Sequence, residues 1–261
     1  MRIFAIRDDR VSSKKDLGYL FYYERADSFM IELPSDADEL ETPLILSSLV
    51  KRKIFTVNEE ISRLWIRQRI VPLDRQNLGA VLKACNLKEY DEFKLLMLHD
   101  GRCEQDECYL KEIRSDALPD EIRDRIMNHH ISGLINLGED RVLVTFSDDK
   151  ARICRLKRYA DFFRGSNVSI SPGGRFLSNG AGRYVSAEKI EEDGEVLPVS
   201  VSDIQHISAA SLVTTEAARE IMGCTRQNLD DMVKKGKLHP VDMVSRSNIY
   251  SQCEITEAAW G

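Results

Sequence analysis

The strongest constraint on this chain lies in its last fifty residues, where capping residues and glycines mark out two short helices. Thr214 and Thr215 offer hydroxyl groups to the free N–H groups of a helix start, and Glu216 places a carboxylate where the helix dipole favours it. Gly223 is suited to the left-handed conformation that ends a helix. Apolar residues recur between these signals at helical spacing, at Ala217, Ala218, Ile221 and Met222. We therefore predict a two-turn helix that stops at Gly223.

A second short helix is predicted directly after the first. Thr225 can cap its start, and Gly236 ends it after Lys234 and Lys235, two cations at the negative end of the helix dipole. Its buried side is formed by Leu229, Met232 and Val233. Two short helices that meet at a tight turn make a helix-turn-helix, which we assign to residues 211–238.

The first residues of the second helix should be exposed, because the first helix covers only its apolar side. These residues are Arg226, Gln227 and Asn228. An arginine can donate two hydrogen bonds to guanine, and glutamine or asparagine can pair with adenine in the same way. The residue types therefore favour the reading of double-stranded DNA.

A hairpin is predicted behind the second helix, within residues 237–250. The apolar runs 238–241 and 248–250 flank a polar turn at 245–247, as is typical of two short strands joined by a turn. Arg246 lies at the tip of this turn, where it can meet a phosphate. The pattern predicts a wing beside the helix-turn-helix.

The C-terminal region resembles the winged helix-turn-helix of the MerR and excisionase superfamily. The resemblance is carried by the run LVTTEAAREIMGCTRQNLDDMVKKGKLHPV, about a fifth of the chain with the hairpin that follows. In that superfamily the second helix enters the major groove and the wing touches the DNA backbone. The resemblance implies a bacterial transcriptional regulator. The predicted DNA-binding residues are Thr225, Arg226, Gln227, Asn228, Lys234, Lys235 and Arg246.

The charge of this region leaves a second interpretation open. From Ser211 to Gly261 there are six Lys or Arg and seven Asp or Glu, and Asp230 and Asp231 lie on the second helix, where phosphates would repel them. Nonspecific DNA binding comes from cationic contacts to phosphates, so it should be weak here. The alternative is a protein-interaction adaptor, antitoxin-like, that uses the helix-turn-helix for docking or dimerisation.

Composition places the chain among ordinary globular proteins. Its 261 residues are 43% hydrophobic and 31% charged, and its net charge of -6 argues against a surface coated for nucleic acid. A small DNA-binding domain attached to an acidic remainder of the protein is compatible with this net charge. No apolar run approaches eighteen residues, and the first residues lead into charges instead of a signal-peptide core. We therefore expect a cytoplasmic protein with no membrane association.

The cysteines do not indicate a disulfide framework or a metal site. All six are scattered without a CxxC pair, which favours reduced thiols. His99, Cys103 and Cys108 form the one cluster that hints at a metal, but its spacing matches no zinc signature. We expect no metal and no cofactor.

The middle of the chain, residues 128–207, is predicted to be a small β-rich domain. Residues 141–146 and 151–156 alternate in hydrophobicity around a turn, and a short helix is expected through Tyr159, Phe162 and Phe163. The runs VLVTFSDDKARICRL and YVSAEKIEEDG resemble a small bacterial β-rich family of unknown function, sometimes found directly before a C-terminal helix-turn-helix. Such a domain would dimerise, position the DNA-binding domain, or simply pack.

The first 127 residues are predicted to form a mixed α+β domain. Strands are expected at residues 1–6, 18–23 and 28–33, and helices around Leu49 and Trp65. A third helix is expected to open at an Asp74 cap. The runs LGYLFYYERADSFMIELP and VPLDRQNLGAVLKACNLKEYDEFKLLMLHDGRCEQDECY are similar to the N-terminal non-catalytic subdomain of HipA-type serine kinase toxins. No glycine-rich phosphate loop, HRD-type loop or DFG-type motif accompanies them, so kinase activity is not implied.

An enzyme would need a catalytic constellation, and the sequence offers none at a recognisable spacing. The richest polar patch surrounds Trp65 and consists of Arg63, Arg67, Arg69, Asp74 and Arg75. It can be a ligand pocket, or a helix face whose arginines pair with carboxylates such as Asp91 and Glu92. The sequence therefore predicts an α+β, non-enzymatic, sequence-specific DNA-binding protein with domains at 1–127, 128–207 and 208–261, and a homodimer or a protein partner is compatible with it.

Overall fold

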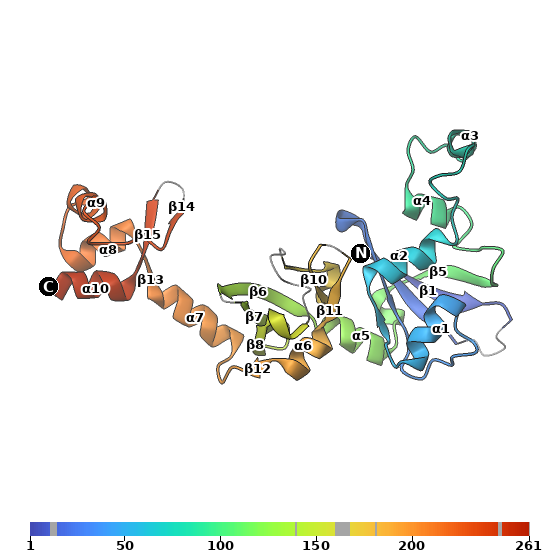
Figure 1. The fold of residues 1–261 in the computed structure, drawn as a ribbon, viewed down its shortest axis with the longest axis horizontal. Helices are drawn as coiled ribbons and strands as arrows, with labels where there is room; N and C mark the ends of the chain where they lie inside the picture. Colours follow the sequence, from blue (N-terminus) through green and yellow to red (C-terminus); the bar gives the residue numbers. More distant parts are fainter. Residues whose placement is uncertain (11–14, 139, 160–167, 181, 245–246, 261) are drawn as a thin grey trace. The chain divides into compact units, whose positions relative to one another are not determined.

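The computed structural model describes residues 1–10, 15–138, 140–159, 168–180, 182–244 and 247–260 (Figure 1). They form two compact units, the first made of Met1–Asp148 with Arg152–Val196 and the second of Asp149–Ala151 with Leu197–Gly261. Both helices and antiparallel sheets are present, which confirms the α+β class. The predicted boundaries after residues 127 and 207 stay predictions.

None of the described helices combines the length and the apolar character needed to cross a membrane.

The first unit opens with a five-stranded antiparallel sheet in the order β4-β3-β2-β1-β5. Its strands are β1 (Arg2–Asp8), β2 (Gly18–Tyr23), β3 (Ser28–Glu32), β4 (Thr56–Val57) and β5 (Cys108–Ile113). The three strands predicted from aromatic and β-branched residues are confirmed. Because side chains alternate along a strand, Phe4 and Ile6 enter one core while Ile3 and Ala5 enter another, so both faces of the sheet are covered.

Helices cover this sheet on its two faces. Trp65 and Ile66 of α2 (Glu59–Arg67) pack with α1 (Leu44–Lys51) and α4 (Glu92–Met97) in the larger core. On the other face, Ile122 of α5 (Asp120–Met127) packs with Phe176 from the middle of the chain. The helix α3 (Leu78–Ala84) begins after Asn77. Its predicted start at Asp74 was therefore wrong, since the chain from Pro72 to Asn77 forms turns instead.

Among its described residues, the remainder of the first unit carries two small sheets and one α-helix. One sheet has the order β12-β8-β7-β6, from β6 (Ile131–Gly138), β7 (Arg141–Phe146), β8 (Ala151–Arg155) and β12 (Glu195–Val196). The other joins β9 (Ser169–Ile170), β10 (Phe176–Ser178) and β11 (Tyr184–Ser186), and α6 (Ala187–Asp193) follows. The adjacent β7 and β8 confirm the predicted hairpin. A 3-10 turn covers Leu156–Tyr159, and the helix expected through Phe162 and Phe163 lies outside the described residues.

The second unit consists of four helices and a three-stranded sheet among its described residues. The helices are α7 (Val201–Ser211), α8 (Thr215–Met222), α9 (Arg226–Lys234) and α10 (Gln252–Trp260). The strands β13 (Leu212–Thr214), β14 (Asp242–Val244) and β15 (Ser247–Ser251) pair in the order β13-β15-β14. The sequence predicted α8, α9 and the hairpin, whereas α10 and the third strand β13 were not anticipated.

Candidate nucleic-acid interface

Helix α8 begins and ends at the residues that the sequence indicated. The Thr214 hydroxyl accepts a hydrogen bond from the Ala217 amide at 3.3 Å, as an N-cap does. Gly223 has a φ of 60°, the left-handed conformation that a residue with a Cβ adopts at a cost. The helix therefore ends there, and Cys224 and Thr225 connect it to the next helix.

Helix α9 is held on one side only. The Thr225 hydroxyl caps it by accepting from the Asn228 amide at 3.3 Å. Leu229 is fully buried and lies in the same core as Ala218 of α8 and Ile255 of α10. This core fixes the rotation of α9 about its own axis. The three helix residues before Leu229 are exposed, because they form the first turn of α9 and lie ahead of its buried residues.

The predicted reading residues are all exposed. Thr225, Arg226, Gln227 and Asn228 form one continuous exposed stretch at the start of α9. Among the described residues, no ion pair joins Arg226 to a carboxylate, so its guanidinium is available to an external acceptor. The helix start thus presents donors and acceptors of the types that read base edges.

The predicted cations Lys234 and Lys235 are exposed too, but they lie at the opposite end of α9. Lys234 lies eight positions after Arg226 along the helix, a rise of about 12 Å. Asp230 and Asp231 lie between the two ends and are half-buried. The structure therefore brings the four residues at the helix start together and sets the two lysines apart from them.

Two paired antiparallel strands lie where the wing was predicted, with one change in their bounds. Strand β14 starts at Asp242 and not at Leu238, because Leu238 is buried in the core of the unit and Pro240 lacks the N–H that a sheet requires. Strands β14 and β15 are antiparallel, and Val244 pairs with Ser247. Arg246, the predicted phosphate contact, lies outside the described residues.

The hairpin also carries a feature that the sequence analysis missed. Val241, Met243 and Val244 are 59%, 65% and 55% exposed, so its outer strand presents apolar side chains to solvent. The chain before the hairpin is tied to α10, since Glu254 accepts from the amide of His239 at 2.9 Å. Alternation alone could not have shown this, because it places the neighbours Met243 and Val244 on opposite faces, and both are exposed.

The arginine-rich patch that the sequence placed around Trp65 is held by ion pairs and a cation–π contact. Arg63 and Arg67 donate to Glu92 at 2.5 and 2.6 Å, and Arg69 stacks 3.6 Å from the centre of the Trp65 ring. Asp91 instead caps α4 by accepting from the Lys94 amide. These contacts favour a paired helix face over a ligand pocket.

The cluster of His99, Cys103 and Cys108 is not assembled as a metal site among the described residues. Cys108 is buried in the large core, and burial raises the pKa of its thiol to about 12. The thiolate needed for metal binding is therefore disfavoured at this position.

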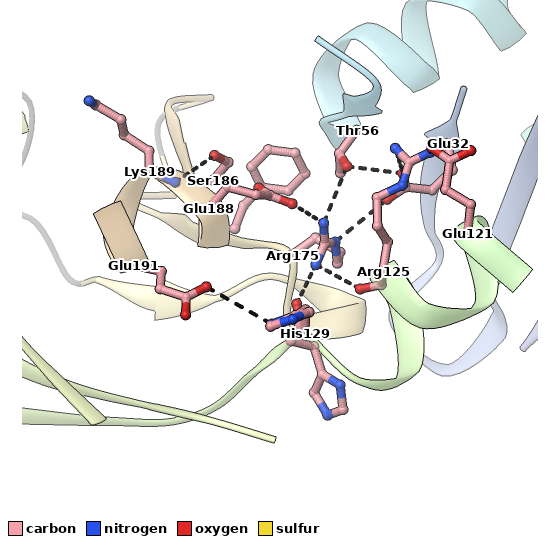
Figure 2. Close-up of polar contacts among 12 residues, drawn as sticks. Glu32, Thr56, Glu121, Arg125, His129, Arg175, Ser186, Glu188, Lys189 and Glu191 are labelled. Carbon is pink, nitrogen blue, oxygen red and sulfur yellow. Dashed lines mark hydrogen bonds and ion pairs between the residues drawn. The ribbon is translucent and has the colours of Figure 1, made fainter. Parts of the chain in front are cut away.

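A buried guanidinium that the sequence analysis did not single out lies in the first unit (Figure 2). Arg175, fully buried, donates to the main-chain oxygens of Arg125 and His129 and faces Glu32 with 3.5 Å between Nε and Oε1. Its outer nitrogen pairs with Glu188, whose side chain is half exposed. The signal for this role was weak, since Arg175 is a single charge between a Pro-Gly-Gly turn and an apolar strand.

Glu32 is the acidic centre of this network. It is fully buried and receives hydrogen bonds from Thr56 at 3.0 Å and Arg125 at 3.1 Å. Burial raises the pKa of Glu32 to about 7, against the opposing effect of Arg175, Arg125 and the Thr56 hydroxyl. The network joins β3, β4, α5 and the segment before β10, so it fastens the middle of the chain to the N-terminal sheet.

A cleft of about 580 Å³ opens beside the network in the first unit. Its lining includes the aromatic residues Phe55, Tyr159, Phe176 and Tyr184 and polar residues such as Asn58, Ser186 and Lys189. Clefts of this size and lining are where small ligands bind in many proteins.

Comparison with protein-family models, with curated proteins and with solved structures found no match to this chain. The resemblances carried by the quoted sequence runs therefore stay predictions, and the site is argued from its own geometry.

Proposed function

We propose that the protein binds double-stranded DNA sequence-specifically through the second unit, as a bacterial transcriptional regulator. In this proposal α8 and α9 are a helix-turn-helix of the MerR and excisionase type, and β14 and β15 are its wing. The observation that carries it is the exposed stretch from Thr225 to Asn228 at the start of a helix that is anchored in the core by the fully buried Leu229.

The start of α9 is the part that would enter the major groove. Arg226 would donate two hydrogen bonds to a guanine, and Gln227 or Asn228 would pair with an adenine. Because Leu229 is buried in the core, the backbone that carries these side chains is held in one position. A rigid backbone favours specific contacts over adaptable ones. The Thr225 cap would keep the first turn intact during binding.

Phosphate contacts would be few in this mode of binding. The candidates are Lys234, Lys235 and Arg246, three cations in a region that is otherwise near neutral. Three neutralised phosphates per protomer give a slope of about -3 for the logarithm of affinity against the logarithm of salt. The affinity for DNA would therefore depend more on contacts to bases than on contacts to the phosphates of the DNA backbone.

A second candidate function is supported by the exposed apolar residues of the same unit. Ile221 of α8 is 41% exposed and Met243 of the hairpin 65% exposed, and Asp230 and Asp231 add negative charge to α9. An apolar and acidic surface fits a basic protein partner better than it fits phosphates. In this alternative the unit is a docking or dimerisation surface of an antitoxin-like adaptor.

The test is selection of bound duplexes from a random DNA pool at near-physiological salt, with the full chain. The wild type is run beside an Arg226→Ala, Asn228→Ala double variant. A matched control removes the same kinds of side chain elsewhere, as Arg114→Ala, Gln205→Ala, since both positions are exposed and neither belongs to α9. The expected result is a sequence motif that the control retains and the double variant loses.

Two results would overturn the proposal. One is the absence of any enriched motif with the wild type, and the other is an equal motif with the double variant. The adaptor alternative predicts the first of these. It predicts as well that a basic protein partner binds and that Asp230→Asn, Asp231→Asn weakens that complex.

A further inference from the structure

Three side chains with metal-binding groups converge at one point of the first unit. His129 follows α5, Asp148 lies in the turn after β7, and Glu191 lies on α6. One ligand atom of each lies within 4.8 Å of the other two. The Nδ1 atom of His129 is 3.6 Å from Asp148 Oδ2 and 3.9 Å from Glu191 Oε2. Figure 2 shows His129 and Glu191 facing one another.

We propose that His129, Asp148 and Glu191 bind a divalent first-row transition metal ion. A hydrogen bond between an imidazole nitrogen and a carboxylate oxygen spans about 2.7–3.2 Å, and these separations are longer. A metal about 2.0–2.2 Å from each ligand holds neighbouring ligand atoms roughly 3.3–3.6 Å apart when they are arranged tetrahedrally. The two separations from His129 are thus close to those of ligands around a common centre, and the ligand atoms of Asp148 and Glu191 lie within 4.8 Å of one another.

The buried network described above holds two of the three ligands in place. Arg175 donates to the main-chain oxygen of His129, and the same guanidinium pairs with Glu188 on α6. Glu188 and Glu191 are three residues apart on that helix, so they lie on the same face. One fully buried side chain therefore fixes both the backbone of His129 and the helix that carries Glu191.

The charge and exposure of the cluster favour an ion with both nitrogen and oxygen ligands. One imidazole and two carboxylates suit Zn²⁺, Co²⁺ or Mn²⁺, whereas a site for Mg²⁺ or Ca²⁺ would use oxygen ligands alone. The His129 side chain is 48% exposed, which leaves room for water at the remaining positions. Arg152 lies 3.7 Å from Glu191 Oε1, on the oxygen that is not directed at His129, and can orient the carboxylate.

The test uses the reduced full-length protein and Co²⁺ as the probe, followed by absorption spectroscopy and calorimetry. We expect one equivalent of Co²⁺ to bind with visible d–d absorption and without the intense near-ultraviolet band of thiolate ligands. The melting temperature should rise with the metal, because the ion binds the folded state. His129→Ala and Glu191→Gln should each weaken Co²⁺ binding at least about tenfold. Even the loss of a residue that only hydrogen-bonds to a metal ligand weakens metal affinity by about that factor.

His99→Ala is the matched control, since it removes another exposed imidazole and belongs to the only cluster that the sequence suggested. It should leave Co²⁺ binding unchanged. The proposal is overturned if no Co²⁺ binds, if thiolate absorption accompanies binding, or if His99→Ala weakens binding while His129→Ala does not. Because His129 is anchored through its main-chain oxygen, His129→Ala is expected to fold, and its circular dichroism in the absence of metal checks this.

Discussion

Replacement of the buried Arg175 by methionine should destabilise the first unit strongly. Methionine keeps much of the length of the side chain and removes its charge. The substitution leaves Glu32 with Arg125 as its remaining charge partner and removes the donor to the main-chain oxygens of Arg125 and His129. All these groups stay inside the protein, where an unpaired polar group cannot be solvated.

The size of the effect follows from burial. Breaking a buried ion pair by removing one partner costs about 3–5 kcal/mol, a large part of the roughly 5–15 kcal/mol that stabilises a typical domain. Glu188→Gln alters the other partner of the same guanidinium, but that side chain is 55% exposed. Its loss of charge should cost less than about 1 kcal/mol, because solvent screens the pair.

The assay is equilibrium unfolding in urea, followed by tryptophan fluorescence. Trp65 is fully buried in the core of the first unit, and a Trp260→Phe background makes it the sole tryptophan. With a slope of about 2–3 kcal/mol per molar urea, Arg175→Met should lower the midpoint by roughly 1–2.5 M and Glu188→Gln by less than about 0.5 M. Equal shifts for the two variants, or no shift for Arg175→Met, would refute the reasoning that burial sets the strength of this network.

Three further predictions concern other parts of the fold. The pKa of Glu32 is about 7 in the folded protein, against an ordinary value of 4.5. The folded state therefore binds more protons than the unfolded state between these pH values, and its stability falls as the pH rises through that window. Glu32→Gln should abolish this fall, as measured by urea titrations at a series of pH values. Gly173→Ala should lower the melting temperature more than Gly180→Ala does, because both glycines have positive φ but only at Gly173 would the new Cβ lie 2.1 Å from the Tyr23 hydroxyl oxygen; equal losses would contradict the clash. Leu229→Ala should cost the second unit about 2–5 kcal/mol in calorimetry, because its side chain is fully buried, and an unchanged transition would refute this.

Local signals in the sequence were enough to predict α8 and α9. Threonine caps and glycine stops act within a few residues of themselves, so Thr214, Gly223 and Thr225 predicted the ends of these helices without reference to the rest of the chain. Strands β1, β2 and β3 were also predicted, because their residues are rich in the aromatic and β-branched types that favour strands. The exposure of Arg226 to Asn228 was expected because these residues open the helix, ahead of its first buried residue Leu229.

Long-range contacts were decided by the tertiary structure alone. Nothing near Arg175 in the sequence indicates that Glu32, 143 positions earlier by numbering, is the carboxylate it faces. The convergence of His129, Asp148 and Glu191 likewise depends on how β7 and α6 are placed. Periodicity describes which side of an element is apolar, but it carries no information on which other element that side meets. The physical reason is that capping and backbone preference are local interactions, whereas the pairing of buried charges is fixed only when the whole core has packed around them.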